Sequence, residues 1–188
     1  TSSFQDTCLY LASMASLCSE MGGKNLIMGS PYNRNLCGRT LEDCFDQAIE
    51  GFTQLADICK ELGVNFCIEP LPPFQTEFIT SASEGERLVK AVNHPNFCLH
   101  LDASALRLES FPPELVIKES ITPQHFHVND PGLAVPGSST KDLPLMIKAL
   151  RNKNYEGFFS IEVVPDGSDP RDILKSSVKY VRQLLENN

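Results

Sequence analysis

The sequence predicts an α/β fold in which short parallel strands alternate with helices. Short apolar runs begin near residues 25, 64, 97, 125 and 158. Segments with apolar residues at helical spacing lie between these runs, and this alternation favours a parallel sheet. Right-handed crossovers then give either an open doubly wound sheet or a closed (β/α)8 barrel. Five strands fit the open sheet by count alone.

The first three elements are a helix over residues 4–21, a strand over 25–28 and a helix over 41–62. Apolar residues recur at helical spacing in both helical segments. The pair Gly22 and Gly23 stops the first helix. Thr40 is a suitable N-cap for the second helix, and Gly63 is a suitable stop.

The rest of the chain repeats this unit. Strands are expected over residues 64–68, 97–101, 125–128 and 158–163, and helices over 83–92, 114–118, 143–150 and 172–185. The loop over residues 130–140 is rich in glycine, proline and serine, and we interpret it as a lid over a substrate. Neither the GxGxxG pattern nor the P-loop pattern follows any strand, so the usual nucleotide-binding signatures are absent.

The composition is that of an acidic globular protein. Of 188 residues, 41% are hydrophobic, and 16 lysines and arginines against 24 aspartates and glutamates give a net charge of −8. This composition predicts a single domain over residues 1–188 with its own core, and it excludes a disordered chain. The acid excess also argues against a nucleic-acid partner, because binding a phosphate backbone needs a basic surface.

Cysteine usage and hydropathy bear on the compartment. The seven cysteines show no CxxC spacing and mostly fall in predicted helices and strands. We interpret them as small core residues in a reducing compartment, which predicts a cytoplasmic location. Residues 1–20 show no targeting pattern, and no apolar run reaches the roughly 18–20 residues of a membrane helix. No membrane partner is therefore expected.

Four consecutive predicted strands each carry one acidic or imidazole side chain near the carboxyl end. These residues are Glu69, Asp102, His127 and Glu162. Sites in open α/β sheets and in barrels are built at this edge of the sheet. Each residue alone is more often a cap, an ion-pair partner or a structural imidazole. If the sheet curves into a barrel, however, the four side chains converge, and a bound cation would neutralise their buried charge.

Three carboxylates and one imidazole form a ligand set made mostly of oxygen. This set favours Mn²⁺, Mg²⁺ or Co²⁺, whereas a structural zinc site would use thiolates. Zn²⁺ stays compatible, because histidine and carboxylates both bind it. The sequence therefore predicts one divalent metal ion.

Further candidates lie close to these strand ends. Arg34 follows a strand and is suited to gripping a phosphate or a carboxylate, the alternative being a solvated loop arginine. His100 shares a strand face with Asp102 and would line the floor of a pocket. Asn129 and Asp130 would orient a ligand or cap their own loop.

Five stretches carry a resemblance to a known family. They are IMGSPYNR (27–34), IEPLPPFQTEF (68–78), HPNFCLHLDASAL (94–106), HFHVNDPGLAVPG (125–137) and YEGFFSIEVV (155–164). The order and spacing of these stretches resemble those of the xylose isomerase-like TIM-barrel superfamily, specifically its sugar phosphate isomerase/epimerase family. The resemblance implies a (β/α)8 barrel of which this chain holds about five parallel strands and lacks the first three βα units. It is also compatible with a homodimer.

The resemblance also implies ligands and a reaction. It makes Glu69, Asp102, His127 and Glu162 the ligands of one divalent ion, with Mn²⁺ expected first. The two glutamates would then act as acid and base on opposite faces of a bound ketose or cyclitol, through an enediolate. The expected function is a metal-dependent sugar isomerase or epimerase, with a small sugar-like molecule as its partner.

Three alternatives stay open. A dehydratase of the same superfamily would use the same metal chemistry to expel water. A phosphodiesterase acting at abasic DNA is disfavoured by the net charge of −8 and by Ala105, which stands where related endonucleases and several epimerases have a histidine. A truncated, non-catalytic barrel would bind a sugar or a partner without metal. Leu133 also replaces an arginine that some epimerases use to bind substrate.

Overall fold

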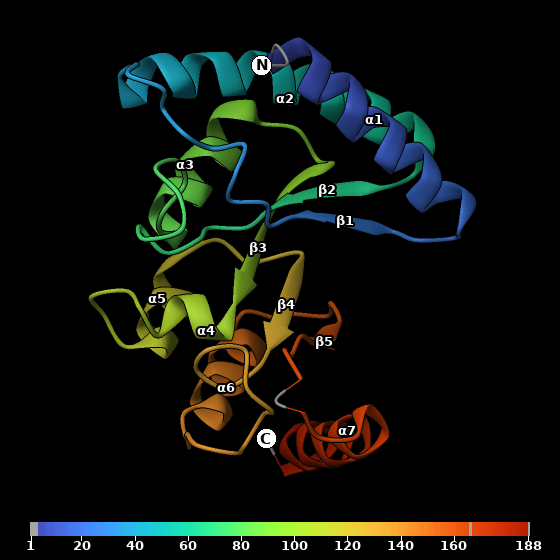
Figure 1. The fold of residues 1–188 in the computed structure, drawn as a ribbon, viewed down its shortest axis with the longest axis vertical. Helices are drawn as coiled ribbons and strands as arrows, with labels where there is room; N and C mark the ends of the chain where they lie inside the picture. Colours follow the sequence, from blue (N-terminus) through green and yellow to red (C-terminus); the bar gives the residue numbers. More distant parts are fainter. Residues whose placement is uncertain (1–3, 166, 188) are drawn as a thin grey trace. The chain divides into compact units, whose positions relative to one another are not determined.

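The computed structural model describes residues 4–165 and 167–187, in which helices alternate with short strands (Figure 1). The elements are α1 (Phe4–Glu20), β1 (Asn25–Met28), α2 (Leu41–Leu62), β2 (Asn65–Ile68), α3 (Ala82–Val92), β3 (Phe97–Asp102), α4 (Ala103–Leu106), α5 (Pro113–Glu119), β4 (His125–Val128), α6 (Leu143–Asn152), β5 (Phe159–Ile161) and α7 (Pro170–Asn187). The strand order β1-β2-β3-β4-β5 follows the chain. The prediction of five strands is therefore confirmed.

The predicted helices and strands agree with the structure to within a few residues, and one element is additional. The short helix α4 follows β3 directly and is absent from the prediction. Asp102 caps it, because its Oδ1 accepts a hydrogen bond from the Ala105 amide at 2.8 Å. A helix of four residues is too short to show the apolar periodicity on which the prediction depends.

The chain divides into two compact units, Thr1–His100 and Leu101–Asn188. The single domain expected over residues 1–188 stays a prediction, and residues 1–3, 166 and 188 lie outside the described residues. None of the helices within residues 4–165 and 167–187 combines the length and the apolar composition of a membrane span.

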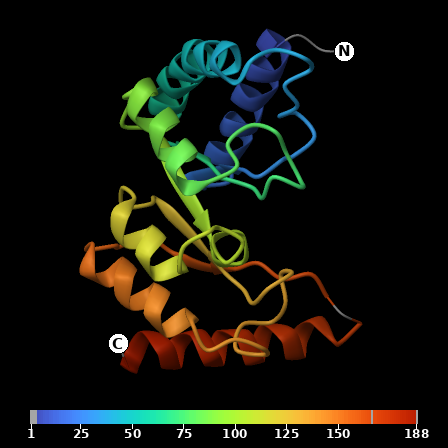
Figure 2. The ribbon, with the colours of Figure 1, turned by 90° about the vertical axis from the view of Figure 1, so that its left-hand side faces the viewer.

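In the first unit, helices pack on a parallel sheet. β1 pairs with β2 in a register that places Asn25 opposite Asn65. β2 pairs with β3 in a register that places Phe66 opposite Phe97. The helices α1 and α2 lie side by side in both ribbon views (Figures 1 and 2). The ring of Phe52 in α2 stacks on Phe97, with the ring centroids 5.2 Å apart, and lies 5.8 Å from the ring of Phe66. This aromatic cluster attaches α2 to the strands whose ends carry the site.

The ends of α2 follow the sequence prediction. Thr40 Oγ1 accepts from the Asp43 amide at 3.1 Å, and Asp43 Oδ2 accepts from the Thr40 amide at 3.3 Å. This reciprocal pair satisfies two amides that the helix itself leaves without partners. Gly63 ends the helix in the left-handed region, with φ at 66°.

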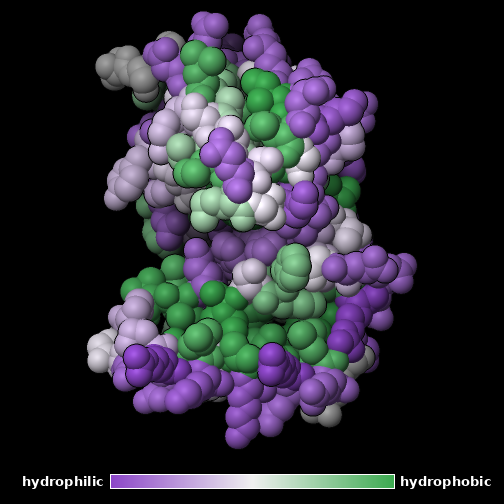
Figure 3. Space-filling view, turned by 90° about the vertical axis from the view of Figure 1, so that its right-hand side faces the viewer, coloured by the Kyte–Doolittle hydropathy of each residue, from purple (hydrophilic) through white to green (hydrophobic). Residues whose placement is uncertain are grey.

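In the second unit, β4 and β5 form a parallel pair in which His127 lies opposite Ser160. Helix α5 packs against α6, and α6 packs against α7 (Figure 2). The loop between β4 and α6 folds back on itself through an antiparallel bridge between Asp130 and Ala134. Apolar side chains gather on one face of this unit (Figure 3), and its exposed large hydrophobic residues include Phe158 and Val164, on either side of β5.

Candidate metal centre

The ends of three strands bring three of the predicted ligands together. Asp102 is the last residue of β3, His127 lies in β4, and Glu162 follows the last residue of β5. One ligand atom from each of these side chains lies within 4.8 Å of the other two. Two ligands on opposite sides of a dication at about 2.1 Å are about 4.2 Å apart, so this spacing suits a single ion.

Asp102 is a buried carboxylate whose two oxygens are both held by hydrogen bonds. Its side-chain Oδ1 accepts from the Ala105 amide at 2.8 Å, and Oδ2 accepts from Asn129 Nδ2 at 2.5 Å. Burial raises the pKa of Asp102, and the negative charge of Glu162 acts in the same direction. A nearby cation would reverse this effect, because it stabilises the ionised carboxylate.

His127 and Glu162 form a contact across the β4–β5 pair. His127 Nδ1 lies 3.1 Å from Glu162 Oε2. The hydrogen bond to His127 lowers the pKa of Glu162, whose side chain is 46% exposed. The ring of His125 meets the ring of His127 edge to face, with the centroids 5.3 Å apart. Burial lowers the pKa of His125, which favours its neutral form.

Glu69 and His100 lie together in the first unit. Glu69 follows β2 and is 6% exposed. Its Oε1 lies 3.7 Å from Nε2 of His100, which is completely buried. Gly29, after β1, leaves the space that the Glu69 carboxylate occupies, because a Cβ at this position would collide with Oε2. His100 therefore faces the Glu69 carboxylate, and its place on the floor of a pocket stays a prediction.

Arg34 is buried, so it is not the solvated loop arginine that the sequence allowed. It is 3% exposed, and its Nη1 donates to the backbone oxygen of Glu69 at 2.6 Å, while Nη2 donates to the backbone oxygen of Met28. Burial lowers the pKa of Arg34 to about 10, and the charge of Glu69 opposes that shift. Arg34 also lines a cavity of about 480 Å³ together with Tyr32 and Gln47. Its guanidinium therefore ties together the carboxyl ends of β1 and β2.

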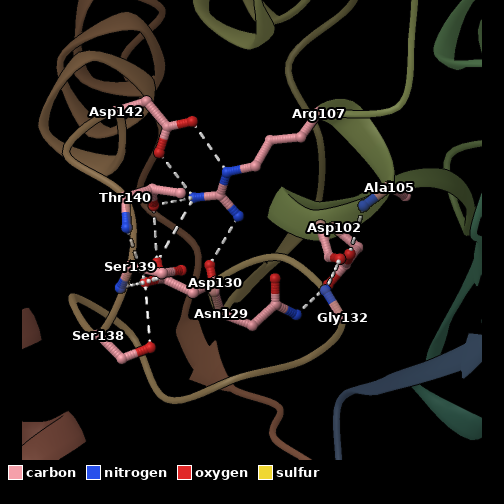
Figure 4. Close-up of polar contacts among 11 residues, drawn as sticks. Asp102, Ala105, Arg107, Asn129, Asp130, Gly132, Ser138, Ser139, Thr140 and Asp142 are labelled. Atoms are coloured by element: carbon pink, nitrogen blue, oxygen red, sulfur yellow. Dashed lines mark hydrogen bonds and ion pairs between the residues drawn. The ribbon is translucent and has the colours of Figure 1, made fainter.

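Arg107, whose side chain is 8% exposed, is a residue that the sequence pattern did not identify. Its guanidinium donates to both carboxylate oxygens of Asp142 at 2.8 Å and to the backbone oxygen of Asn129 at 2.9 Å (Figure 4). Asp130 was expected either to orient a ligand or to cap its own loop, and the structure shows that it caps the loop. Its carboxylate accepts hydrogen bonds from the backbone amides of Ser139 and Thr140 at 2.6 and 3.1 Å. The available sequence signal was an arginine inside the otherwise apolar segment ASALRL (103–108).

Comparison with known proteins defines the class. The profile of the family described as "Xylose isomerase-like TIM barrel" matches residues 5–184, and the chain belongs to this family. The predicted family and TIM-barrel fold are therefore confirmed. This result decides between the two sheet architectures that the strand count left open.

Individual relatives are sugar epimerases. The chain is 31% identical over 120 residues to "D-psicose 3-epimerase" of Agrobacterium fabrum, covering 63% of this chain and 41% of that protein. It is 25% identical over 122 residues to "Ketose 3-epimerase" of Arthrobacter globiformis, covering 60% and 42%. The solved D-psicose 3-epimerase from Clostridium cellulolyticum H10 superposes with a TM-score of 0.84 at 18% identity, covering 96% of this chain and 71% of that one. The sequence matches thus span about two fifths of these relatives.

Proposed function

We propose that this chain carries the metal-binding part of a ketose epimerase. The observation on which the proposal depends is the convergence of Asp102, His127 and Glu162, whose ligand atoms lie within 4.8 Å of one another. The names of the matched relatives, D-psicose 3-epimerase and ketose 3-epimerase, support the reaction class. The proposed substrate is a small ketose or a related cyclitol.

Glu69 is the proposed fourth ligand. Like the other three residues, it stands at the carboxyl end of a parallel strand, where barrel enzymes build their sites. Its carboxylate is buried, and a divalent ion would supply the positive charge that a buried carboxylate needs. The donor set of three carboxylates and one imidazole suits Mn²⁺, which we propose as the ion, and it is compatible with Mg²⁺, Co²⁺ and Zn²⁺.

The two glutamates would move the proton. A bound divalent ion would acidify the C–H bond beside the substrate carbonyl by withdrawing electron density from it. Glu162 is partly exposed and has a lowered pKa, so it is ionised at neutral pH and suited to accept that proton. Glu69 would return a proton to the opposite face of the same carbon, which inverts its configuration. One proton leaves and one is added, so the product is an epimer with no net oxidation.

Several finer expectations belong to this proposal. Arg34, His100 and Asn129 are proposed to contact substrate, and a homodimer in the cytoplasm is the proposed setting. The guanidinium of Arg34 donates to two backbone oxygens, and among the described residues its Nε has no hydrogen-bond partner. A substrate contact would therefore have to use Nε or a rearranged side chain.

Metal content is the first test. The chain, loaded with Mn²⁺ and desalted, is expected to retain about one equivalent of metal by elemental analysis. His127→Ala should lose the metal. His94→Ala is the matched control, because His94 precedes the amino end of β3, opposite to Asp102, and its Nε2 pairs with Asp57 at 3.5 Å. Equal metal content in the wild type and in His127→Ala would contradict the assignment of the site.

Proton exchange is the second test. The metal-loaded chain is incubated with D-fructose and other ketohexoses in D₂O, and deuterium beside the carbonyl is followed by NMR. We expect deuterium at C3 together with the C3 epimer. Deuterium-free sugars from a metal-loaded chain would count against the epimerase. A product with new ultraviolet absorbance would instead identify a dehydratase.

A further inference from the structure

A side-chain hydrogen bond joins Asp102 to the residue that follows the neighbouring strand β4. Asn129 Nδ2 donates to Asp102 Oδ2 at 2.5 Å, and Asn129 is completely buried. A carboxylate can only accept, so the amide nitrogen must face Asp102 and the amide oxygen must point away. Among the described residues, that oxygen has no hydrogen-bond partner. The Asn129 side chain is thus held at one end only, and its position depends on its backbone.

Arg107 holds that backbone. Its Nη1 donates to the Asn129 backbone oxygen at 2.9 Å. Its Nε and Nη2 each bind one carboxylate oxygen of Asp142 at 2.8 Å, which fixes the plane of the guanidinium. The side chain is 8% exposed, so water competes little for these bonds. Figure 4 shows the guanidinium between Asp142 and Asn129, with Asn129 reaching on to Asp102.

Two residues of the loop between β4 and α6 also contact the Arg107 guanidinium. Arg107 Nη2 donates to Thr140 Oγ1 at 3.2 Å and lies 3.8 Å from Asp130 Oδ1. Thr140 Oγ1 in turn donates to Asp130 Oδ1 at 2.8 Å. These bonds use only residues of the second unit and need no metal ion. The arrangement that orients Asn129 is therefore built entirely from side chains and backbone of this unit.

We propose that Arg107 is a positioning residue of the metal centre, which acts on Asp102 through Asn129. The inference rests on the proposed function in one respect, namely that Asp102 is a metal ligand. Arg107 fixes the Asn129 backbone, and the Asn129 amide fixes one oxygen of Asp102 while the Ala105 amide fixes the other. The carboxylate is thereby oriented in advance, which lowers the conformational entropy lost when the ion binds.

A purely structural role for Arg107 makes a different prediction. An arginine that only anchors the loop would affect stability and leave the metal affinity of the folded chain unchanged. A positioning role predicts that Arg107→Gln weakens Mn²⁺ binding by about 10- to 100-fold, as for other residues that orient a ligand. Arg107→Lys keeps the charge but loses the forked geometry, so it should restore only part of the affinity. The affinities are measured by calorimetry on chains shown to be folded by circular dichroism.

A control and a double variant sharpen this measurement. Arg151→Gln is the matched control, because Arg151 is exposed and donates to the Leu185 backbone oxygen in the same unit. It should bind Mn²⁺ like the wild type. Asn129→Ala should weaken binding about as much as Arg107→Gln, and the double variant should be no weaker than either single one. Additive losses, or wild-type affinity in folded Arg107→Gln, would overturn the proposal.

A second readout works without metal. In the ¹⁵N NMR spectrum of the metal-free chain, the side-chain NH₂ protons of Asn129 should exchange slowly in the wild type and in Arg151→Gln. They should exchange fast in Arg107→Gln or, if that variant fails to fold, in Arg107→Lys and Asp142→Asn. Slow exchange in these variants refutes the link between Arg107 and Asn129. If the wild type binds no metal while exchange still depends on Arg107, the proposed function fails and the link stands.

Discussion

His127 Nδ1 lies 3.1 Å from Glu162 Oε2, and the parallel register of β4 and β5 pairs His127 with Ser160, two residues before Glu162. The pairing continues past the strand, because the Glu162 amide donates to the Val128 backbone oxygen at 3.3 Å. The backbone position of Glu162 is therefore set by the sheet itself. A residue held in this way can serve as a ligand at little entropic cost.

Replacing the carboxylate of Glu162 tests its role directly. Glu162→Gln keeps the size and the polarity of the side chain but removes the charge. We expect Mn²⁺ affinity to fall by more than about 100-fold, because even loss of a residue that only orients a ligand costs about 10- to 100-fold. Calorimetric titration with Mn²⁺ measures the effect. Exposed Glu156→Gln is the control, and equal affinities in the two variants would remove Glu162 from the ligand set.

The Asp130 carboxylate should make stability depend on pH in the acid range. Burial alone would raise its pKa, but hydrogen bonds from Ser139 and Thr140 outweigh burial and lower the pKa below 3.8. A lowered pKa means that the folded chain binds the proton less well than the unfolded chain. The stabilisation is therefore fully present above about pH 3.8 and is lost as the pH falls through the lower pKa of the folded state.

Asp130→Asn isolates this contribution. At pH 7 we expect the variant to lose about 2–3 kcal/mol of unfolding free energy, since a neutral amide oxygen replaces a buried, charged acceptor of several hydrogen bonds. The difference from the wild type should shrink as the pH falls towards 2, because the wild-type carboxyl then becomes neutral as well. Urea unfolding at a series of pH values provides both numbers. A difference that stays constant with pH would contradict this account.

The sequence predicted where the proposed ligands lie better than it predicted the residues that support them. Asp102, His127 and Glu162 were predictable because the carboxyl ends of parallel strands meet at one edge, whatever the loops do. The burial of Arg34 was not, since it depends on the path of the loop after β1. Arg107 was missed because it follows a helix too short for periodicity, and because its partner Asp142 lies 35 residues further on. Contacts of that kind arise only from the folded chain.

The aromatic cluster of the first unit should dominate its stability. Phe52 is 3% exposed and lies 5.2 Å from the ring of Phe97. Phe52→Ala leaves a cavity between α2 and the sheet, so we expect a loss of about 3–5 kcal/mol in unfolding free energy. Phe74→Ala removes the same side chain where it is 75% exposed and should cost less than about 0.5 kcal/mol. Similar losses in the two variants, measured by urea unfolding, would mean that the cluster does not stabilise the unit.

Gly29 offers a way to move Glu69 without altering it. A Cβ at residue 29 would collide with Glu69 Oε2, which is the end of a flexible side chain. The carboxylate can therefore swing away, and Gly29→Ala should change the unfolding free energy by less than about 1 kcal/mol. If Glu69 is a ligand and a proton donor, however, Gly29→Ala should weaken Mn²⁺ binding and slow the exchange of deuterium into a ketose. Ser30→Ala, at the exposed neighbouring residue, should leave both unchanged. If the folded Gly29→Ala chain keeps wild-type metal affinity and wild-type deuterium exchange, neither property depends on the position of the Glu69 carboxylate. That result would exclude Glu69 from the site.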